Sequence, residues 1–167
     1  PLFIQKNLLF FPKTPTFAQN HRFMLKKLIL ILCLGGITTS FGQTAEEYVG
    51  RGFAKVLLGD YRGALLDYNE AIALNPKFAN AYYNRGNAKA ELSDYRGAIL
   101  DYNEALALDP KNADAYLNRG FAKVDLGDYR GAILDYNEAL ALDPKDAKTY
   151  ADRGLAKDNL GDYRGAI

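Results

Sequence analysis

The chain has 167 residues, of which 49% are hydrophobic and 25% are charged, a composition that is ordinary for a folded globular protein and argues against a disordered one. The formal net charge is +1, but residues 1–43 hold five basic and no acidic residues, whereas residues 44–167 hold sixteen basic and twenty acidic ones. The longer part is therefore mildly acidic and lacks the basic cluster that a phosphate backbone requires, so we expect no nucleic-acid partner.

The N-terminal residues have the pattern of an export signal. Met24–Lys27 is a short cationic lead, an apolar run follows at Leu28–Ile37, and small residues stand at Ser40 and Gly42. This order predicts a signal peptide over residues 24–42 that is cleaved after Gly42, so that a bacterial cell exports the chain to the periplasm or the medium, where it has no membrane contact. The alternative is a membrane anchor through an uncleaved segment, although ten apolar residues are half of the roughly 20 that a spanning helix needs.

The two ends of the sequence predict a fragment of a longer product. Met24 is the single methionine, so residues 1–23 are interpreted as mistranslated sequence upstream of the true start or as a disordered segment. Cys33 is the single cysteine and leaves with the predicted signal, so we expect no intramolecular disulfide in the mature chain.

Most of the remaining sequence is repeated. The stretch DYRGAILDYNEALALDPK occurs at residues 94–111 and again at 128–145, and a close variant lies at 60–77. The offset is 34 residues each time, and self-similarity at a fixed period of this length is typical of repeat architectures. The period divides the chain into repeat 1 at 45–78, repeat 2 at 79–112, repeat 3 at 113–146 and a truncated repeat 4 at 147–167.

Each unit is predicted to contain two helices. In the copied half, apolar or small residues recur from Tyr95 at i, i+3, i+4 and i+7, which indicates a helix with one apolar face. Asp94 is a good N-cap, and Asp109–Pro110 ends the helix. The other half, such as residues 115–127, is helical by composition and ends at Gly127, which suits a left-handed cap. A single helix pair cannot bury its apolar side, so we expect the pairs to stack into a solenoid.

Several residue types recur at matching places in the units. Glycines stand inside the first helix, small residues and tyrosines four places apart lie in the second helix, and prolines follow in the loop. These residues are Gly86 and Gly120, Ala98 and Ala132, Tyr102 and Tyr136, and Pro110 and Pro144. With the period, they resemble the tetratricopeptide repeat over Ala45–Ile167. The resemblance implies an all-α fold, a right-handed α-solenoid of stacked antiparallel helix pairs.

The first helices depart from the commonest form of that family by carrying basic residues at two positions that are usually apolar or tyrosine. These are Arg51, Arg85, Arg119 and Arg153, and Lys55, Lys89, Lys123 and Lys157. We hypothesise that each arginine reaches an aspartate of the second helix, Asp67, Asp101 or Asp135. The alternative is an arginine that lies along the surface with its stem on apolar neighbours.

The second helices carry glycines near their starts, at Gly63, Gly97 and Gly131. A glycine inside a helix costs roughly 1 kcal/mol relative to alanine. Close approach of a neighbouring helix would explain these glycines, and so would inheritance by duplication.

Repeats 2 and 3 differ at seven of 34 positions, and five of the seven lie in the first helix. Those five are spaced 0, 3, 7, 10 and 11 and therefore project from one helical face. In tetratricopeptide proteins this face lines the concave surface, where peptides usually dock. The resemblance thus implies a groove formed by Val49, Phe53, Val56, Leu57, Tyr83, Asn87, Ala90, Glu91, Leu117, Phe121, Val124, Asp125, Ala151, Leu155 and Asp158.

The chemistry of this groove predicts a partner. It is apolar and aromatic with scattered acids and amides, which suits a protein or peptide segment with hydrophobic anchors and a basic residue. Further repeats, a capping helix or self-association through the open C-terminal repeat are alternative ways to cover it. Some members of the family bind the C-terminal carboxylate of chaperones through lysine, asparagine and arginine side chains. Asn87, Asn118 and Lys148 fit that pattern, but Tyr83 and Asp152 replace two cations, so we do not predict this activity.

Catalysis finds no support in the mature sequence. The single histidine, His21, and Cys33 lie before the predicted cleavage site, and no glycine-rich phosphate loop or metal-ligand spacing follows. We therefore expect a non-enzymatic protein-interaction scaffold without a cofactor. The alternative is a docking or sensing module of a larger enzyme or signalling protein.

Overall fold

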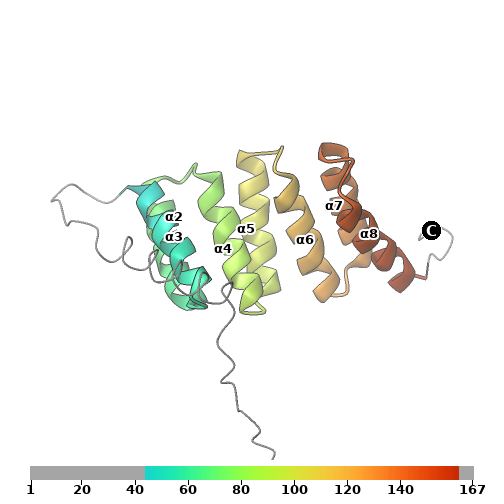
Figure 1. Cartoon of the computed structure of the whole chain (residues 1–167), viewed down its shortest axis with the longest axis horizontal. Helices are drawn as coiled ribbons and strands as arrows, with labels where there is room; N and C mark the ends of the chain where they lie inside the picture. The colour runs from blue at the N-terminus through green and yellow to red at the C-terminus, as the bar shows by residue number, and fades with distance from the viewer. Residues whose placement is uncertain (1–43, 162–167) are drawn as a thin grey trace, which may run out of the picture. The chain divides into compact units, whose positions relative to one another are not determined.

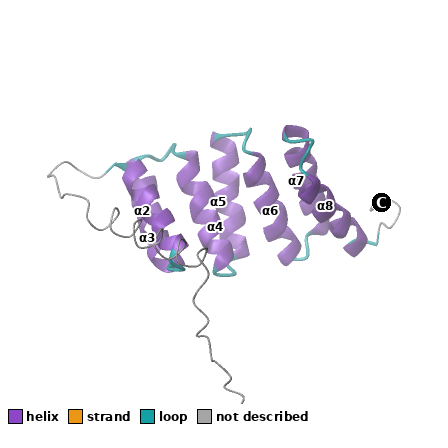
Figure 2. Cartoon of the chain, in the orientation of Figure 1, coloured by secondary structure: helices purple, strands orange, loops and turns teal. Residues whose placement is uncertain are grey.

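The computed structural model describes residues 44–161, which fold into α-helices without strands (Figure 1). The helices, in chain order, are α2 (Ala45–Leu57), α3 (Tyr61–Leu74), α4 (Ala79–Glu91), α5 (Tyr95–Leu108), α6 (Ala113–Asp125), α7 (Tyr129–Leu142) and α8 (Ala147–Asn159). Figure 2 shows them as a row of helices joined by short loops. The predicted upstream segment and signal peptide, and the last residues of repeat 4, lie outside the described residues. No helix within 44–161 is both long and apolar enough to cross a membrane.

The ends of the helices follow the predicted capping residues. Asp94 precedes α5, and its side chain accepts a hydrogen bond from the Gly97 N–H, as its counterparts do in α3 and α7. The first helices end at Gly59 and Gly127, whose φ angles of 81° and 79° lie in the left-handed region that glycine tolerates best. Ser93 takes the same place after α4 with φ of 63°. The predicted caps therefore account for the starts of α3, α5 and α7 and for the ends of α2 and α6.

The glycines at the starts of the second helices lie against the capping residues of their own helices. A Cβ atom at Gly97 would fall 2.2 Å from the Oδ2 atom of the capping residue Asp94. The corresponding distances at Gly63 and Gly131 are 2.0 and 2.1 Å. The first of the two alternatives, close approach of a neighbouring helix, is not supported, because the nearest obstacle is the N-cap carboxylate of the same helix.

The core is a column of tyrosines and alanines between the two helix layers. Tyr68, Tyr102 and Tyr136 are each 1% exposed and occupy matching positions in α3, α5 and α7. A Cβ at Gly86 would lie 2.7 Å from the Tyr102 ring, and Gly120 stands in the same relation to Tyr136. Each ring therefore packs directly on the backbone of the preceding first helix, which fixes the spacing within every pair.

The helix pairs stack in chain order, since each helix packs against the one before it. The first helices also contact each other along the stack, α2 with α4 and α4 with α6. The expected all-α solenoid of stacked antiparallel helix pairs is confirmed. We call the outward side of α2, α4, α6 and α8 the first-helix face.

A row of buried ion pairs joins the two helices of each complete repeat. Asp101 is 3% exposed, and its carboxylate lies 2.6 Å from Arg85 Nη2 and 2.8 Å from Lys89 Nζ. The same arrangement occurs at Asp67 and at Asp135. The predicted arginine–aspartate pairs are confirmed, and the lysines join them as a second cation. We call this row the Arg–Asp–Lys ladder, formed by Arg51, Asp67, Lys55, Arg85, Asp101, Lys89, Arg119, Asp135 and Lys123.

The ladder also links neighbouring repeats. Arg85 Nη1 donates to Asn69 Oδ1 of the preceding repeat at 2.8 Å, and Arg119 donates to Asn103 at 2.7 Å. Burial alone would raise the pKa of Asp67, but hydrogen bonds from Arg51 and Lys55 outweigh it and hold this pKa below its usual range. The buried carboxylate of Asp67 is therefore ionised and paired at neutral pH.

Candidate functional site

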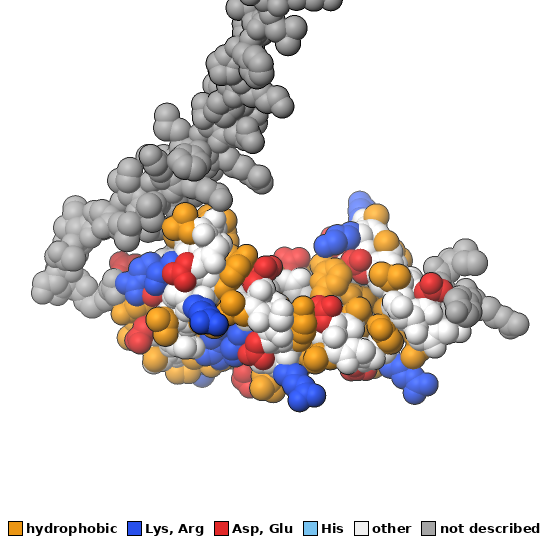
Figure 3. Space-filling view, turned by 90° about the horizontal axis from the view of Figure 1, so that it is seen from below, with side chains coloured by type: hydrophobic (Ala, Val, Ile, Leu, Met, Phe, Trp, Pro, Cys, Tyr) orange, Lys and Arg blue, Asp and Glu red, His pale blue; other side chains and the backbone are white. Residues whose placement is uncertain are grey.

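The predicted groove residues fall into three classes of exposure on the first-helix face. The exposed ones are Phe53, Leu57, Glu91, Asp125, Ala151, Leu155 and Asp158. The half-buried ones are Val56, Tyr83, Asn87, Ala90, Leu117, Phe121 and Val124. Figure 3 shows hydrophobic and acidic side chains next to each other over the described residues, whose surface is hollowed between its two ends. The face is therefore mixed in polarity.

Val49 is the exception, since the structure buries it. Its side chain is 8% exposed and packs in the core with Ala45 and Tyr68. At the matching position of repeat 2, the longer Tyr83 extends far enough for its hydroxyl to meet Asn118 of repeat 3. The assignment of Val49 to the groove was wrong, because valine at this position is too short to extend past the core.

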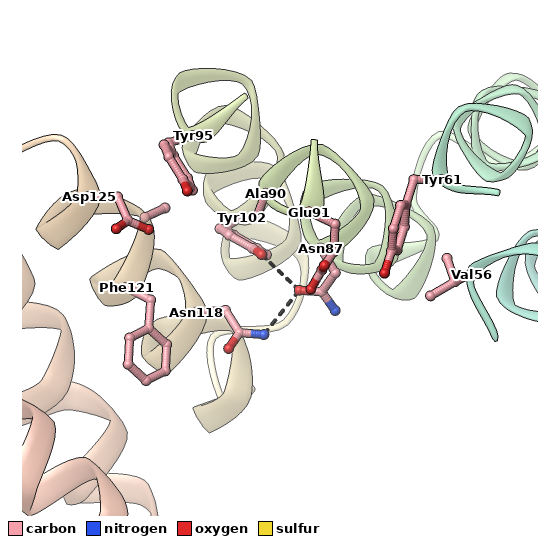
Figure 4. Close-up of a pocket in the computed structure, with 11 residues that line it drawn as sticks. Val56, Tyr61, Asn87, Ala90, Glu91, Tyr95, Tyr102, Asn118, Phe121 and Asp125 are labelled. Atoms are coloured by element: carbon pink, nitrogen blue, oxygen red, sulfur yellow. Dashed lines mark hydrogen bonds between the residues drawn. The ribbon is translucent and has the colours of Figure 1, made fainter. Parts of the chain in front are cut away.

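A pocket of about 400 Å³ opens on the first-helix face around α4 and α6 (Figure 4). We call it the α4–α6 pocket. Six of its lining residues were predicted from the sequence, namely Val56, Asn87, Ala90, Glu91, Phe121 and Asp125. Five others were not assigned to the groove, namely Tyr61, Tyr95, Tyr102, Asn118 and Ala122. The remaining predicted residues lie outside this pocket.

The tyrosines missed by the sequence prediction come from the second helices. Tyr61 and Tyr95 are the first residues of α3 and α5, and each follows the short turn, 58–60 or 92–94, after a first helix. The short turn brings this aromatic ring to the same edge of the stack as the end of the first helix. An aromatic residue directly after the N-cap, repeated every 34 residues, was the signal that could have revealed them.

Hydrogen bonds fix the amide groups on the pocket floor. The Tyr102 hydroxyl donates to Asn87 Oδ1 at 2.7 Å, and Asn118 Nδ2 donates to the same oxygen at 3.0 Å (Figure 4). Asn118 Nδ2 also lies 3.1 Å from the Tyr83 hydroxyl, which is close enough for a hydrogen bond. Burial raises the pKa values of Tyr83 and Tyr102, so both phenols stay protonated at neutral pH. The floor is therefore a preorganised polar surface.

The charges of the pocket are acidic. Glu91 and Asp125 are its charged lining residues, and both are exposed. The carboxylate of Glu91 raises the pKa of the nearby Tyr61. Figure 4 shows Tyr61 and Val56 on one side of Glu91, with Tyr95, Phe121 and Asp125 on the other. Two carboxylates therefore flank an aromatic surface.

The acidic character continues beside the pocket on α8. One carboxylate oxygen of Asp152 is buried without a hydrogen-bond partner among the described residues, and burial raises the pKa of Asp152 above its usual range. Asp152 occupies the position of Asn118 in the preceding repeat. Asn118 bonds to Tyr83 and Asn87 of the repeat before it. The matching residues before Asp152 are Leu117 and Phe121, whose side chains form no hydrogen bonds.

An internal cation already touches the aromatic surface. Lys148 Nζ of α8 lies 4.9 Å from the centroid of the Phe121 ring. The Phe121 ring in turn packs against Tyr136 with centroids 5.8 Å apart. An ammonium group is attracted to such a ring face at this distance.

The described residues hold no group of three or more histidine, cysteine, aspartate or glutamate side chains arranged to bind a metal ion. The arrangement on the first-helix face offers hydrogen-bonding amides, aromatic rings and carboxylates. These groups suit the recognition of a polypeptide.

A family model described as TPR repeat matches the chain at residues 52–93, 86–127 and 122–161. The chain belongs to the tetratricopeptide-repeat family. The comparison with curated proteins gave no match. Solved structures, among them two TPR domains, also match the fold.

Three of these structures illustrate the range of similarity. The Arabidopsis OM64 TPR domain is 32% identical with a TM-score of 0.67, and the match covers 69% of this chain and 95% of that one. The first TPR of Spaghetti (RPAP3), bound to the HSP90 peptide SRMEEVD, is 26% identical with a TM-score of 0.69 over 71% and 97% of the two chains. MamA is 21% identical with a TM-score of 0.72, and the match covers 89% of this chain and 84% of that one. This similarity shows the fold alone.

Proposed function

We propose that this chain is a protein-interaction scaffold that binds a peptide segment of a partner protein on its first-helix face. The observation that carries the proposal is the α4–α6 pocket, which opens where repeats 2 and 3 differ in sequence. A similar fold in the first TPR of Spaghetti holds a peptide, which supports this kind of activity.

The pocket combines the features that peptide docking needs. Its amide floor is held by hydrogen bonds to Asn87 and Asn118, so little side-chain entropy is lost when a peptide backbone binds there. Phe53 is 52% exposed and Leu155 is 60% exposed, so apolar anchors are available on both sides of the pocket along the stack.

The proposal does not extend to peptides such as the HSP90 peptide SRMEEVD that the first TPR of Spaghetti binds. Tyr83 and Asp152 stand where the family's carboxylate-binding members carry cations, and the hydroxyl of Tyr83 is already paired with Asn118. A terminal carboxylate would meet an anion at Asp152 instead of a guanidinium group.

Selection from a random peptide library displayed on phage, followed by fluorescence anisotropy with synthetic copies of the selected peptides, tests the proposal. The full chain is compared with a Phe53→Ala/Phe121→Ala variant, which we expect to bind at least about tenfold more weakly. The matched control is Leu100→Ala/Leu134→Ala, since these leucines of α5 and α7 are 65% and 66% exposed and lie outside the pocket lining. Circular dichroism verifies that each variant is folded.

Two results would overturn the proposal. One is that the library yields no peptide that binds the unmodified chain. The other is that only the Leu100→Ala/Leu134→Ala control loses binding, which would assign docking to the second helices instead.

We also propose that residues 24–42 direct export and are removed after Gly42. N-terminal sequencing of the chain produced in a bacterium should then begin at Gln43. A product that keeps residues 24–42 and sediments with membranes would favour the anchored alternative.

A further inference from the structure

We propose that the α4–α6 pocket takes the lysine or arginine side chain of the bound peptide. Glu91 and Asp125 supply the carboxylates, and Tyr95 supplies the aromatic ring. This inference rests on the proposed peptide-binding function and adds the chemical class of the residue that is recognised.

Charge complementarity is the first argument. The residues that line the pocket include two acids and no lysine or arginine. Within residues 44–161, the ion pairs of the structure all belong to the Arg–Asp–Lys ladder, and neither Glu91 nor Asp125 takes part in one. The pocket therefore keeps an acidic charge that a basic side chain from outside would compensate.

The acidic charge of the pocket is uncompensated because the nearby cations belong to the Arg–Asp–Lys ladder. Arg119 and Lys123 are on the same helix as Asp125, but both are bound to Asp135, and Lys123 Nζ also donates to the backbone carbonyl of Gly131 at 3.4 Å. Arg85 and Lys89 of α4 are bound to Asp101 in the same way. The cations of α4 and α6 are thus committed to the opposite side of their helices.

The aromatic surface is the second argument. The Phe121 ring already carries the ammonium group of Lys148 from α8 at 4.9 Å. A peptide lysine or arginine that enters the pocket would find the same kind of ring at Tyr95, next to the carboxylate of Asp125 (Figure 4). The combination of a ring face with a carboxylate favours a cation more than either group alone.

Asp152 is an independent third argument. Its buried carboxylate oxygen lacks a hydrogen-bond partner among the described residues, whereas Asn118 at the matching position has two. Both Asp152 and Asp125 lie close enough to Tyr136 for their charges to add to the effect of burial on its pKa. Because this oxygen is buried, a bound peptide would not reach it, and Asp152 would act on a basic side chain in the pocket only through its charge.

The experiment uses the phage-selected peptides and the full chain. Peptides selected on the unmodified chain should be enriched in lysine or arginine at one position beside a hydrophobic residue. In anisotropy titrations, the Glu91→Gln/Asp125→Asn variant should bind a selected peptide at least about tenfold more weakly, as expected for the loss of charge-assisted hydrogen bonds. Replacement of the peptide's basic residue by glutamine should cause a similar loss on the unmodified chain and little further loss on the variant.

The matched control is Glu104→Gln/Glu138→Gln, which removes two exposed carboxylates of α5 and α7 outside the pocket lining. It should bind like the unmodified chain. Equal weakening by the control would show that only long-range charge matters and would overturn the inference. Selected peptides without a basic residue, or with an acidic C-terminus such as SRMEEVD, would also overturn it while the proposed peptide-binding function stands. If no peptide is selected at all, the proposed function itself fails.

Discussion

The Arg–Asp–Lys ladder and the α4–α6 pocket use the same kinds of polar side chain on opposite sides of the first helices. In the ladder, the buried carboxylate of Asp101 is matched by Arg85 and Lys89 within its own repeat. In the pocket, the carboxylates of Glu91 and Asp125 have no basic partner among the described residues. The ladder residues recur in the three complete repeats and pair with one another, whereas Glu91 and Asp125 stand at a position that differs between repeats 2 and 3.

The largest expected effect comes from breaking the ladder. Asp101→Ala leaves Arg85 and Lys89 partly buried without their counter-ion, and we expect a loss of about 3 kcal/mol in the free energy of unfolding. Urea denaturation followed by circular dichroism measures it. The control Glu104→Ala on the same helix is exposed and should change the stability by less than about 0.5 kcal/mol. Equal stability of the two variants would show that the ladder is energetically neutral.

The next effect separates two kinds of glycine. Gly86→Ala puts a Cβ 2.7 Å from the Tyr102 ring, which is locked in the core, so it should destabilise the fold by about 2 kcal/mol. Gly97→Ala meets only the carboxylate of the N-cap residue Asp94, which can rotate away toward solvent. The lost cap and the gained helix propensity, each about 1 kcal/mol, should then nearly cancel. Similar thermal midpoints for the two variants would contradict this account of the core.

A smaller effect of opposite sign is expected at Asp152. Burial raises the pKa of Asp152 in the folded chain. At a pH above the pKa of the unfolded chain, the ionised carboxylate therefore lowers the free energy of unfolding. Asp152→Asn should therefore stabilise the protein by about 1 kcal/mol or less at pH 7. This gain should vanish as the pH falls through the folded pKa, where the folded carboxyl takes up its proton. A variant that is less stable at pH 7 would mean that Asp152 has a stabilising partner.

The smallest effect on stability is expected in the pocket. Glu91→Gln/Asp125→Asn alters two exposed side chains that take part in none of the ladder's ion pairs, so the free energy of unfolding should change by less than about 0.5 kcal/mol. Urea denaturation measures it beside the binding titrations. A large loss of stability would mean that these acids stabilise the fold as the ladder does, and would contradict their assignment to binding.

The sequence was sufficient for the architecture because period, caps and turn residues are local signals. Asp94 begins a helix and Gly127 ends one, as expected, and the hypothesised pairing of Arg85 with Asp101 is confirmed. The participation of Lys89 was not anticipated, because a sequence does not show which of two cations on one helix can reach a buried carboxylate.

The site was only partly predictable because helical period gives the direction of a side chain but not its depth. Val49 points toward the same face as Tyr83, yet one is in the core and the other reaches the next repeat. Tyr61 and Asn118 enter the pocket from neighbouring helices, and their contribution depends on how closely the repeats stack. The distance between repeats depends on side-chain packing, so the spacing of residues along one helix does not predict it.

The most direct test of the central claim is photo-crosslinking of a selected peptide that carries a benzophenone group, with the attachment sites identified by mass spectrometry. The account predicts crosslinks to α4 and α6, within residues 87–91 and 118–125 around the α4–α6 pocket. Crosslinks concentrated on the exposed leucines of α5 and α7, Leu100 and Leu134, would contradict it.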